Sequence, residues 1–140
     1  MSLIDDLKKH EGFRSKPYKC TEGYLTIAYG QRLDYIEVDE ETGSKWLMDK
    51  VDKIKKELDN KFLWYSKAPE EVRDIVVNMS YQMGVSGFAQ FKRTISYLER
   101  GLYNKASNEM LDSLWSRQTP ERSKESVSYT HLRAHETKAN

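Results

Sequence analysis

The chain has 140 residues, a formal net charge of +1, three histidines and one cysteine. This length fits one domain, or two small lobes that share a core. A net charge near zero gives no electrostatic reason to expect nucleic acid as a partner. The single cysteine excludes an internal disulfide framework and a multi-cysteine zinc site. Three histidines also disfavour a histidine-rich metal site, so we expect no metal and no cofactor.

Two kinds of segment that would direct the chain to a membrane are missing from the sequence. No apolar run approaches the roughly 20 residues that a membrane helix needs. No basic start followed by an apolar stretch marks a secretory signal peptide. We therefore expect a protein that is made in the cytosol.

A short amphipathic helix is predicted over residues 3–11, with Ser2 as its N-cap. Leu3, Leu7 and Glu11 follow one another at intervals of four residues, so Glu11 falls on the apolar stripe. Burial and the negative end of the helix dipole would both favour the neutral carboxylic acid there, which suits a general acid. A frayed helix end with a solvated carboxylate is the alternative, and spacing alone favours it.

A hairpin follows, because β-forming residues flank a predicted turn at Glu22-Gly23. We expect strands at residues 17–20 and 24–29, and a third short strand near 32–35. The turn would bring Cys20 close to Thr26 on the returning strand. Taken alone, the pair is as well explained by a small buried cysteine and an ordinary strand threonine. A cysteine hydrolase is disfavoured because no histidine is placed to activate the thiol.

Helices dominate the remainder of the predicted structure. A long helix should start at an Asp39 N-cap and run to about Asn60, with acidic residues in its first turn. Its apolar stripe consists of Trp46, Leu47, Val51, Ile54 and Leu58. Further helices are expected from Pro69 to Gly84, at 91–100 and at 103–115, with a last helical turn opened by Pro120.

Three regions are expected along the chain. Residues 1–60 would form an N-terminal lobe with the hairpin and the connecting helix, and residues 61–125 a helical lobe. Residues 126–140 have no usable apolar period and resemble a translated sequencing-adapter tail, so they are left out of the functional argument.

Three further stretches carry a resemblance to a known family. They are HEGFR at 10–14 followed by PYKCTEGYLTIAYG at 17–30, NMSYQMG at 78–84, and WSRQTPER at 115–122. In this order they resemble the T-even phage-type lysozymes, endolysins that hydrolyse peptidoglycan, over about residues 3–125. The resemblance implies a mainly α, α+β lysozyme-like fold. In that fold a small N-terminal lobe with a β-hairpin is joined by a long helix to a helical lobe, and a cleft between the lobes binds glycan.

The resemblance also implies a reaction and the residues that perform it. The family cleaves the β-1,4 bond between N-acetylmuramic acid and N-acetylglucosamine and so lyses the host cell. Glu11 matches the general acid, Cys20 stands at the second catalytic position, and Thr26 matches the residue that helps to hold the attacking water. The substrate-binding positions matched are Gly30, Gln82 and Arg122, the last of which pairs with the catalytic glutamate in the family.

Partners and location follow from the same resemblance. The substrate would be bacterial peptidoglycan, and the enzyme would act as a monomer. It would stay in the host cytoplasm until a holin-type membrane protein releases it to the cell wall or periplasm.

The chain departs from the family pattern at several places, among them Gln31, which replaces a frequent histidine. Cys20 stands where the best-known members carry aspartate, Ala28 replaces a common glycine, and the suspect tail replaces a C-terminal helix. A free thiol, with a pKa of about 8.5, is mostly neutral at pH 7 unless cations lower that pKa, and Lys16 and Lys19 are the local candidates. A lytic transglycosylase, which needs one acidic residue, and an impaired peptidoglycan-binding remnant are the alternatives.

Overall fold

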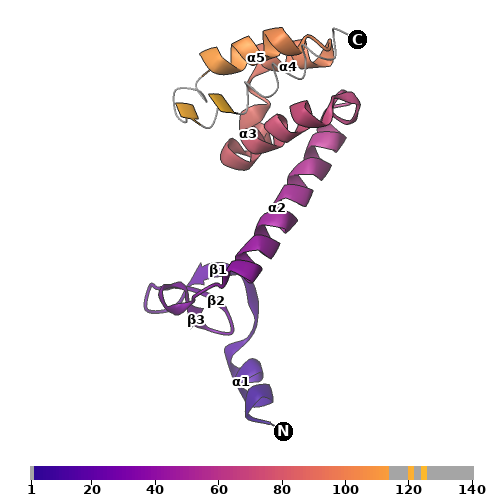
Figure 1. Ribbon diagram of the computed structural model, residues 1–140. Helices are drawn as coiled ribbons and strands as arrows, with labels where there is room; N and C mark the ends of the chain where they lie inside the picture. Colours follow the sequence, from indigo (N-terminus) through magenta and orange to yellow (C-terminus); the bar gives the residue numbers. More distant parts are fainter. Residues whose placement is uncertain (1, 114–119, 122–123, 126–140) are drawn as a thin grey trace. The chain divides into compact units, whose positions relative to one another are not determined.

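The computed structural model describes residues 2–113, 120–121 and 124–125. These residues form five helices of at least eight residues, two short 3-10 turns and one small antiparallel sheet, shown in Figure 1. The prediction of a mainly α, α+β lysozyme-like fold is confirmed. The chain divides into two compact units, Met1–Ser44 and Lys45–Asn140. The division falls within the long helix α2 (Glu40–Lys61), so most of that helix belongs to the second unit.

The first unit contains one helix, a three-stranded sheet and a 3-10 turn. In chain order they are α1 (Leu3–Glu11), β1 (Arg14–Lys19), β2 (Leu25–Ala28), β3 (Gln31–Arg32) and η1 (Leu33–Tyr35). The strands are antiparallel in the order β1-β2-β3. The predicted hairpin is confirmed, but the third strand starts one residue earlier than expected. Residues 33–35 form a 3-10 turn instead of a strand, because the chain already leaves the sheet after Arg32.

The register of this sheet places three side chains together. Thr26 pairs with Tyr18 of β1 on one side and with Arg32 of β3 on the other. Residues directly opposite one another in an antiparallel pair project from the same face of the sheet. Tyr18, Thr26 and Arg32 therefore form a row across one face. Thr26 is the only buried residue among those described in the first unit.

Helix α1 begins and ends where the sequence predicts. The Ser2 hydroxyl accepts a hydrogen bond from the Asp5 backbone N–H at 3.1 Å, and Gly12 ends the helix with a φ of 71°. The expected burial of its apolar stripe is not found: α1 has no buried residue, and Glu11 is exposed. The reason is that the small sheet of this unit leaves every α1 side chain at least partly open. The solvated carboxylate, which spacing alone favoured, is therefore the arrangement observed.

The second unit is helical. After α2 come η2 (Tyr65–Lys67), α3 (Glu70–Phe88), α4 (Lys92–Glu99) and α5 (Tyr103–Asp112). Asp39 caps α2 as predicted, since its Oδ1 accepts the Thr42 backbone N–H at 2.9 Å. Gly84, predicted to end a helix, breaks α3 with a φ of 81°, and one more helical turn follows it.

All buried apolar side chains of the described residues lie in the second unit, between Ile54 and Met110. The most deeply buried come from α2, α3, α4 and α5: Leu58, Val76, Met79, Phe88, Leu98, Ala106 and Met110. The predicted stripe of α2 is correct at Ile54 and Leu58. It is wrong at Trp46 and Leu47, which are exposed because they precede the part of α2 that joins this core. Within the part of the chain that the structure describes, no helix is both long and apolar enough to cross a membrane.

Candidate active site

The carboxylate of Glu11 lies against the α-carbon of Gly30. A Cβ atom placed on Gly30 would approach Glu11 Oε2 to 2.6 Å, which is too close for any real contact. Gly30 also has a φ of 75°, a left-handed conformation that glycine adopts without strain. It occupies the last position of the two-residue loop between β2 and β3. The structure thus brings together Glu11 and Gly30, two of the residues predicted for the site. Because Gly30 has no side chain, the Glu11 carboxylate can occupy the space beside it.

Thr26 is held in place by its own strand. It is 2% exposed, and its hydroxyl donates a hydrogen bond to the Tyr24 carbonyl oxygen at 3.0 Å. A buried hydroxyl that keeps a partner avoids the cost of an unsatisfied polar group. The position of this hydroxyl is therefore fixed by the turn that precedes β2.

Cys20 lies at the start of the same turn. Its backbone N–H donates to the Tyr24 carbonyl at 2.9 Å, and its carbonyl accepts from the Gly23 N–H at 2.9 Å. The turn therefore folds the chain back so that the thiol meets the Thr26 hydroxyl, which confirms the predicted proximity of these two side chains.

Hydrogen bonding within the turn lowers the pKa of the Cys20 thiol below its ordinary value. The backbone of Tyr24 contributes most, followed by the backbone of Glu22, and the Thr26 hydroxyl adds a smaller effect. Partial desolvation and the negative charge of Glu22 act in the opposite direction. The lowered pKa of Cys20 therefore comes from hydrogen bonding within the turn. It does not come from Lys16 and Lys19, which the sequence suggested. Since the Thr26 hydroxyl has one hydrogen, it can serve either the Tyr24 carbonyl or the thiolate at a given time.

Ala28, which stands where the family commonly has glycine, adopts a φ of 58°. A left-handed conformation costs a residue with a Cβ about 1–2 kcal/mol, which explains why glycine suits this position.

The two remaining predicted residues, Gln82 and Arg122, belong to the sequence range of the second unit. Gln82 is exposed on α3 in the second unit. Arg122 lies outside the described residues. The substrate-binding roles of Gln82 and Arg122 therefore stay predictions.

One group next to the site has no signal in the sequence pattern. The guanidinium of Arg32 lies over the ring of Tyr24, 3.6 Å from its centroid, and 4.7 Å from the centroid of the Tyr35 ring. It also pairs with Asp34, Nη2 to Oδ2, at 2.9 Å. Only the register of β2 against β3, which sets Arg32 opposite Thr26, brings this cluster beside the predicted residues.

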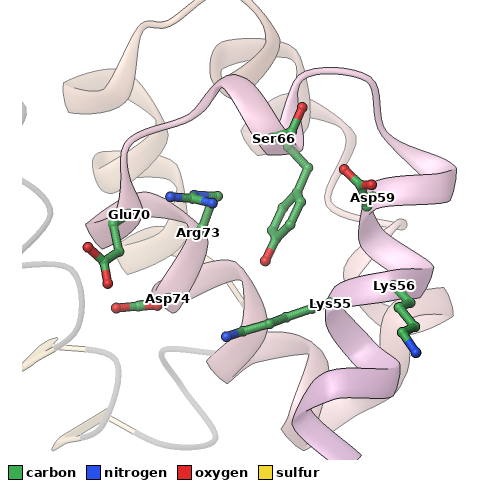
Figure 2. A pocket seen from close by; sticks show the side chains of 8 residues that line it. Lys55, Lys56, Asp59, Ser66, Glu70, Arg73 and Asp74 are labelled. Atoms are coloured by element: carbon green, nitrogen blue, oxygen red, sulfur yellow. The ribbon is translucent and has the colours of Figure 1, made fainter.

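A separate pocket of about 380 Å³ lies in the second unit, among α2, η2 and α3. Side chains of both charges line it, and Figure 2 shows Lys55 of α2 reaching toward Asp74 of α3. It contains none of the residues that the sequence predicts for the site. Opposite charges facing one another on a helical surface are typical of a solvated face, so we assign this pocket no role.

The first unit thus places an acidic side chain at the end of a helix and polar side chains on the hairpin that follows, as expected for a lysozyme-like fold. Comparison with known proteins agrees. The chain belongs to the phage lysozyme family, whose characteristic sequence it matches over residues 8–134.

The chain is also similar to individual proteins over most of its length. The chain is 29% identical over 156 aligned positions to probable T4-type lysozyme 1 of Dictyostelium discoideum, covering 91% of this chain and 92% of that protein. It is 28% identical to probable T4-type lysozyme 2 of the same organism, with the same coverage. It is also 30% identical to the pre-baseplate central spike protein Gp5 of Enterobacteria phage T4, over 85% of this chain and 26% of that protein.

Replacing Gly30 with alanine is expected to displace the Glu11 carboxylate. A displacement of about 1 Å in a catalytic group costs up to ~100-fold in rate, so any glycosidase activity that depends on Glu11 should fall by about 10- to 100-fold. Gly23→Ala is the matched control, since Gly23 has a φ of 88° but nothing within 4 Å of the added methyl group. Both variants carry similar backbone strain, so they should lose similar stability in thermal unfolding. Equal activity per folded molecule in the two variants would contradict the role of the contact.

The lowered pKa of Cys20 predicts that its thiolate forms at lower pH in the folded protein than in the denatured chain. The rate of alkylation by iodoacetamide, measured against pH, should therefore rise with a midpoint below that of the same chain in denaturant. Thr26→Val removes the hydroxyl and should move the midpoint upward. Identical midpoints for the folded and denatured chains would show that the turn does not stabilise the thiolate.

Proposed function

We propose that this protein is an N-acetylmuramidase. It hydrolyses the β-1,4 bond between N-acetylmuramic acid and N-acetylglucosamine in bacterial peptidoglycan. The observation that carries the proposal is the seating of Glu11 against Gly30, in the same compact unit as the paired Cys20 and Thr26. Membership of the phage lysozyme family supports a glycosidase of this kind.

In this proposal Glu11 is the general acid. Its carboxyl group is exposed at the end of α1, so a glycosidic oxygen can reach it without opening the fold. Protonating the leaving oxygen as the bond breaks is the step that glycosidases assign to a carboxylic acid. The bare α-carbon of Gly30 leaves room for this carboxyl group beside the hairpin, and proton transfer depends on where the acid lies.

Cys20 and Thr26 act on the other side of the reaction, where the water attacks and positive charge develops on the sugar. The Thr26 hydroxyl is fixed by its turn and can hold a water by hydrogen bonding. In its thiolate form, towards which hydrogen bonding in the turn shifts the thiol, Cys20 would accept the proton that the attacking water gives up, and its negative charge would stabilise the oxocarbenium-like transition state. Water-mediated hydrolysis of this kind inverts the anomeric centre and uses catalytic groups about 6.5–9.5 Å apart.

The biological setting is proposed from family membership alone. We propose that the enzyme acts as a monomer and lyses the host cell. A holin-type membrane protein would release it from the host cytoplasm to the cell wall or periplasm. Gln82 and Arg122 are proposed to contribute to binding the glycan.

Glu11→Gln provides the direct test. Purified peptidoglycan is digested with the wild type and with the variant, and the products are identified by mass spectrometry. The wild type should release new reducing-end muramic acid, and the variant should be slower by about 100-fold or more, the usual contribution of a general acid. Anhydro ends would instead indicate a lytic transglycosylase. Binding of peptidoglycan without any product, by protein shown to be folded, would indicate a binding remnant.

Cys20 is tested with three side chains at one position. Cys20→Asp should preserve or raise the hydrolysis rate, because a carboxylate carries the required charge at neutral pH. Cys20→Ala should lower it by about 100-fold, the usual size of the effect when one stabilising electrostatic group is lost. Equal rates for cysteine, aspartate and alanine would remove the side chain from the mechanism.

A further inference from the structure

The Arg32 cluster is a cation held in a fixed orientation beside the proposed catalytic groups. Its guanidinium stacks on Tyr24, and the Tyr35 ring lies 4.7 Å away, so two aromatic rings flank it. Nη1 donates to the Tyr35 hydroxyl at 3.3 Å, and Nη2 donates to Asp34 at 2.9 Å. Stacking and hydrogen bonds together restrict the planar group to one orientation, which reduces the entropy lost when it binds a further partner.

The cluster has unused capacity to bind an anion. A guanidinium has five N–H donors, and the hydrogen bonds to Tyr35 and Asp34 use two of them. Nε is covered and without a hydrogen-bond partner among the described residues, so the open donors lie on the outer edge formed by Nη1 and Nη2. The Arg32 side chain is 30% exposed at the surface of the first unit.

The ion pair between Arg32 and Asp34 does not prevent a ligand from binding to Arg32. The side chain of Asp34 is 70% exposed, and an ion pair in such a position is strongly screened by water. A carboxylate from a ligand can therefore share or replace Asp34 at little cost. Planar carboxylates suit the guanidinium because two parallel N–H bonds can reach their two oxygens.

The position of the Arg32 cluster in the sheet indicates which class of ligand it binds. Arg32 is the register partner of Thr26, so its side chain leaves the sheet from the same face as the hydroxyl that meets Cys20. In the binding mode that we propose, the scissile bond lies over Thr26 and Cys20, and the muramyl residue lies on the side of Arg32. In peptidoglycan that residue carries a short peptide stem with free carboxylates.

We propose that Arg32, oriented by Tyr24 and Tyr35, binds a carboxylate of the peptide stem on the muramyl residue beside the scissile bond. This makes Arg32 a specificity residue that favours stem-bearing glycan over bare glycan. The inference rests on the proposed muramidase function. A purely structural role, in which Arg32 braces η1 against β2, is the competing explanation.

The experiment compares two substrates for each variant. One is a soluble peptidoglycan fragment that keeps its peptide stems, and the other is the same glycan after an amidase has removed them. The ratio of kcat/KM on the two substrates is independent of the fraction of enzyme that is folded. Arg32→Gln should lower this ratio about tenfold, as expected for losing one hydrogen bond to a charged group. Arg32→Lys keeps the charge without the planar fork and should give an intermediate ratio.

Arg14→Gln is the matched control. Arg14 also stacks on a tyrosine of the same sheet, 4.3 Å from the centroid of the Tyr18 ring, but it is an exposed residue of β1. Its substitution should leave the ratio unchanged. Raising the salt concentration should reduce the preference of the wild type for stem-bearing glycan and have little effect on Arg32→Gln, since the lost contact is ionic.

Several results would overturn the inference. Equal slowing of both substrates by Arg32→Gln would identify Arg32 as a structural brace. No slowing of either substrate would show that Arg32 has no role in binding. A wild type that hydrolyses both substrates equally well would also exclude the preference. If the wild type hydrolyses neither substrate, the muramidase proposal fails, and the role of Arg32 fails with it. The first three results leave the muramidase proposal intact, so the two failures are distinguishable.

Discussion

The pairing of Thr26 between two strands is the constraint on which the site depends. Tyr18 on one side and Arg32 on the other enclose it, so Thr26 is buried in a unit whose other described residues are all at least partly exposed. A shift of one residue in either pairing would turn the hydroxyl to the opposite face of the sheet. The turn that fixes this register also carries Cys20, so strand pairing and the chemistry of the thiol have a common origin.

In the proposed mechanism, Cys20 takes the place of a carboxylate as the source of negative charge. A carboxylate at this position needs no assistance, because its unperturbed pKa of about 4 leaves it charged at neutral pH. A thiol needs assistance, and the backbone of Tyr24 and Glu22 provides it. Backbone hydrogen bonds belong to the turn rather than to any side chain, so they do not depend on which residue stands at position 20. The turn can therefore serve a thiol as it would serve a carboxylate.

Sequence reasoning succeeded where local chemistry decides the structure. The Asp39 cap, the break at Gly84 and the proximity of Cys20 to Thr26 all depend on residues close together in the chain. It failed where the outcome depends on distant partners. The exposure of α1 depends on what packs against it, and the Arg32 cluster depends on a register that no spacing in the sequence reveals. The roles of the site residues were reached through family resemblance, because spacing alone favoured a solvated Glu11.

The distribution of buried apolar side chains has a consequence for motion. The described core begins at Ile54, whereas Glu11, Cys20 and Thr26 all precede it and belong to a unit held by strand pairing and short-range hydrogen bonds. Segments with few buried apolar contacts open at a lower free energy than the core does. The amide hydrogens of β1, β2 and β3 should therefore exchange with solvent before those of α3. Heating would loosen the catalytic hairpin first, and the enzyme would lose its activity while its helical unit was still folded.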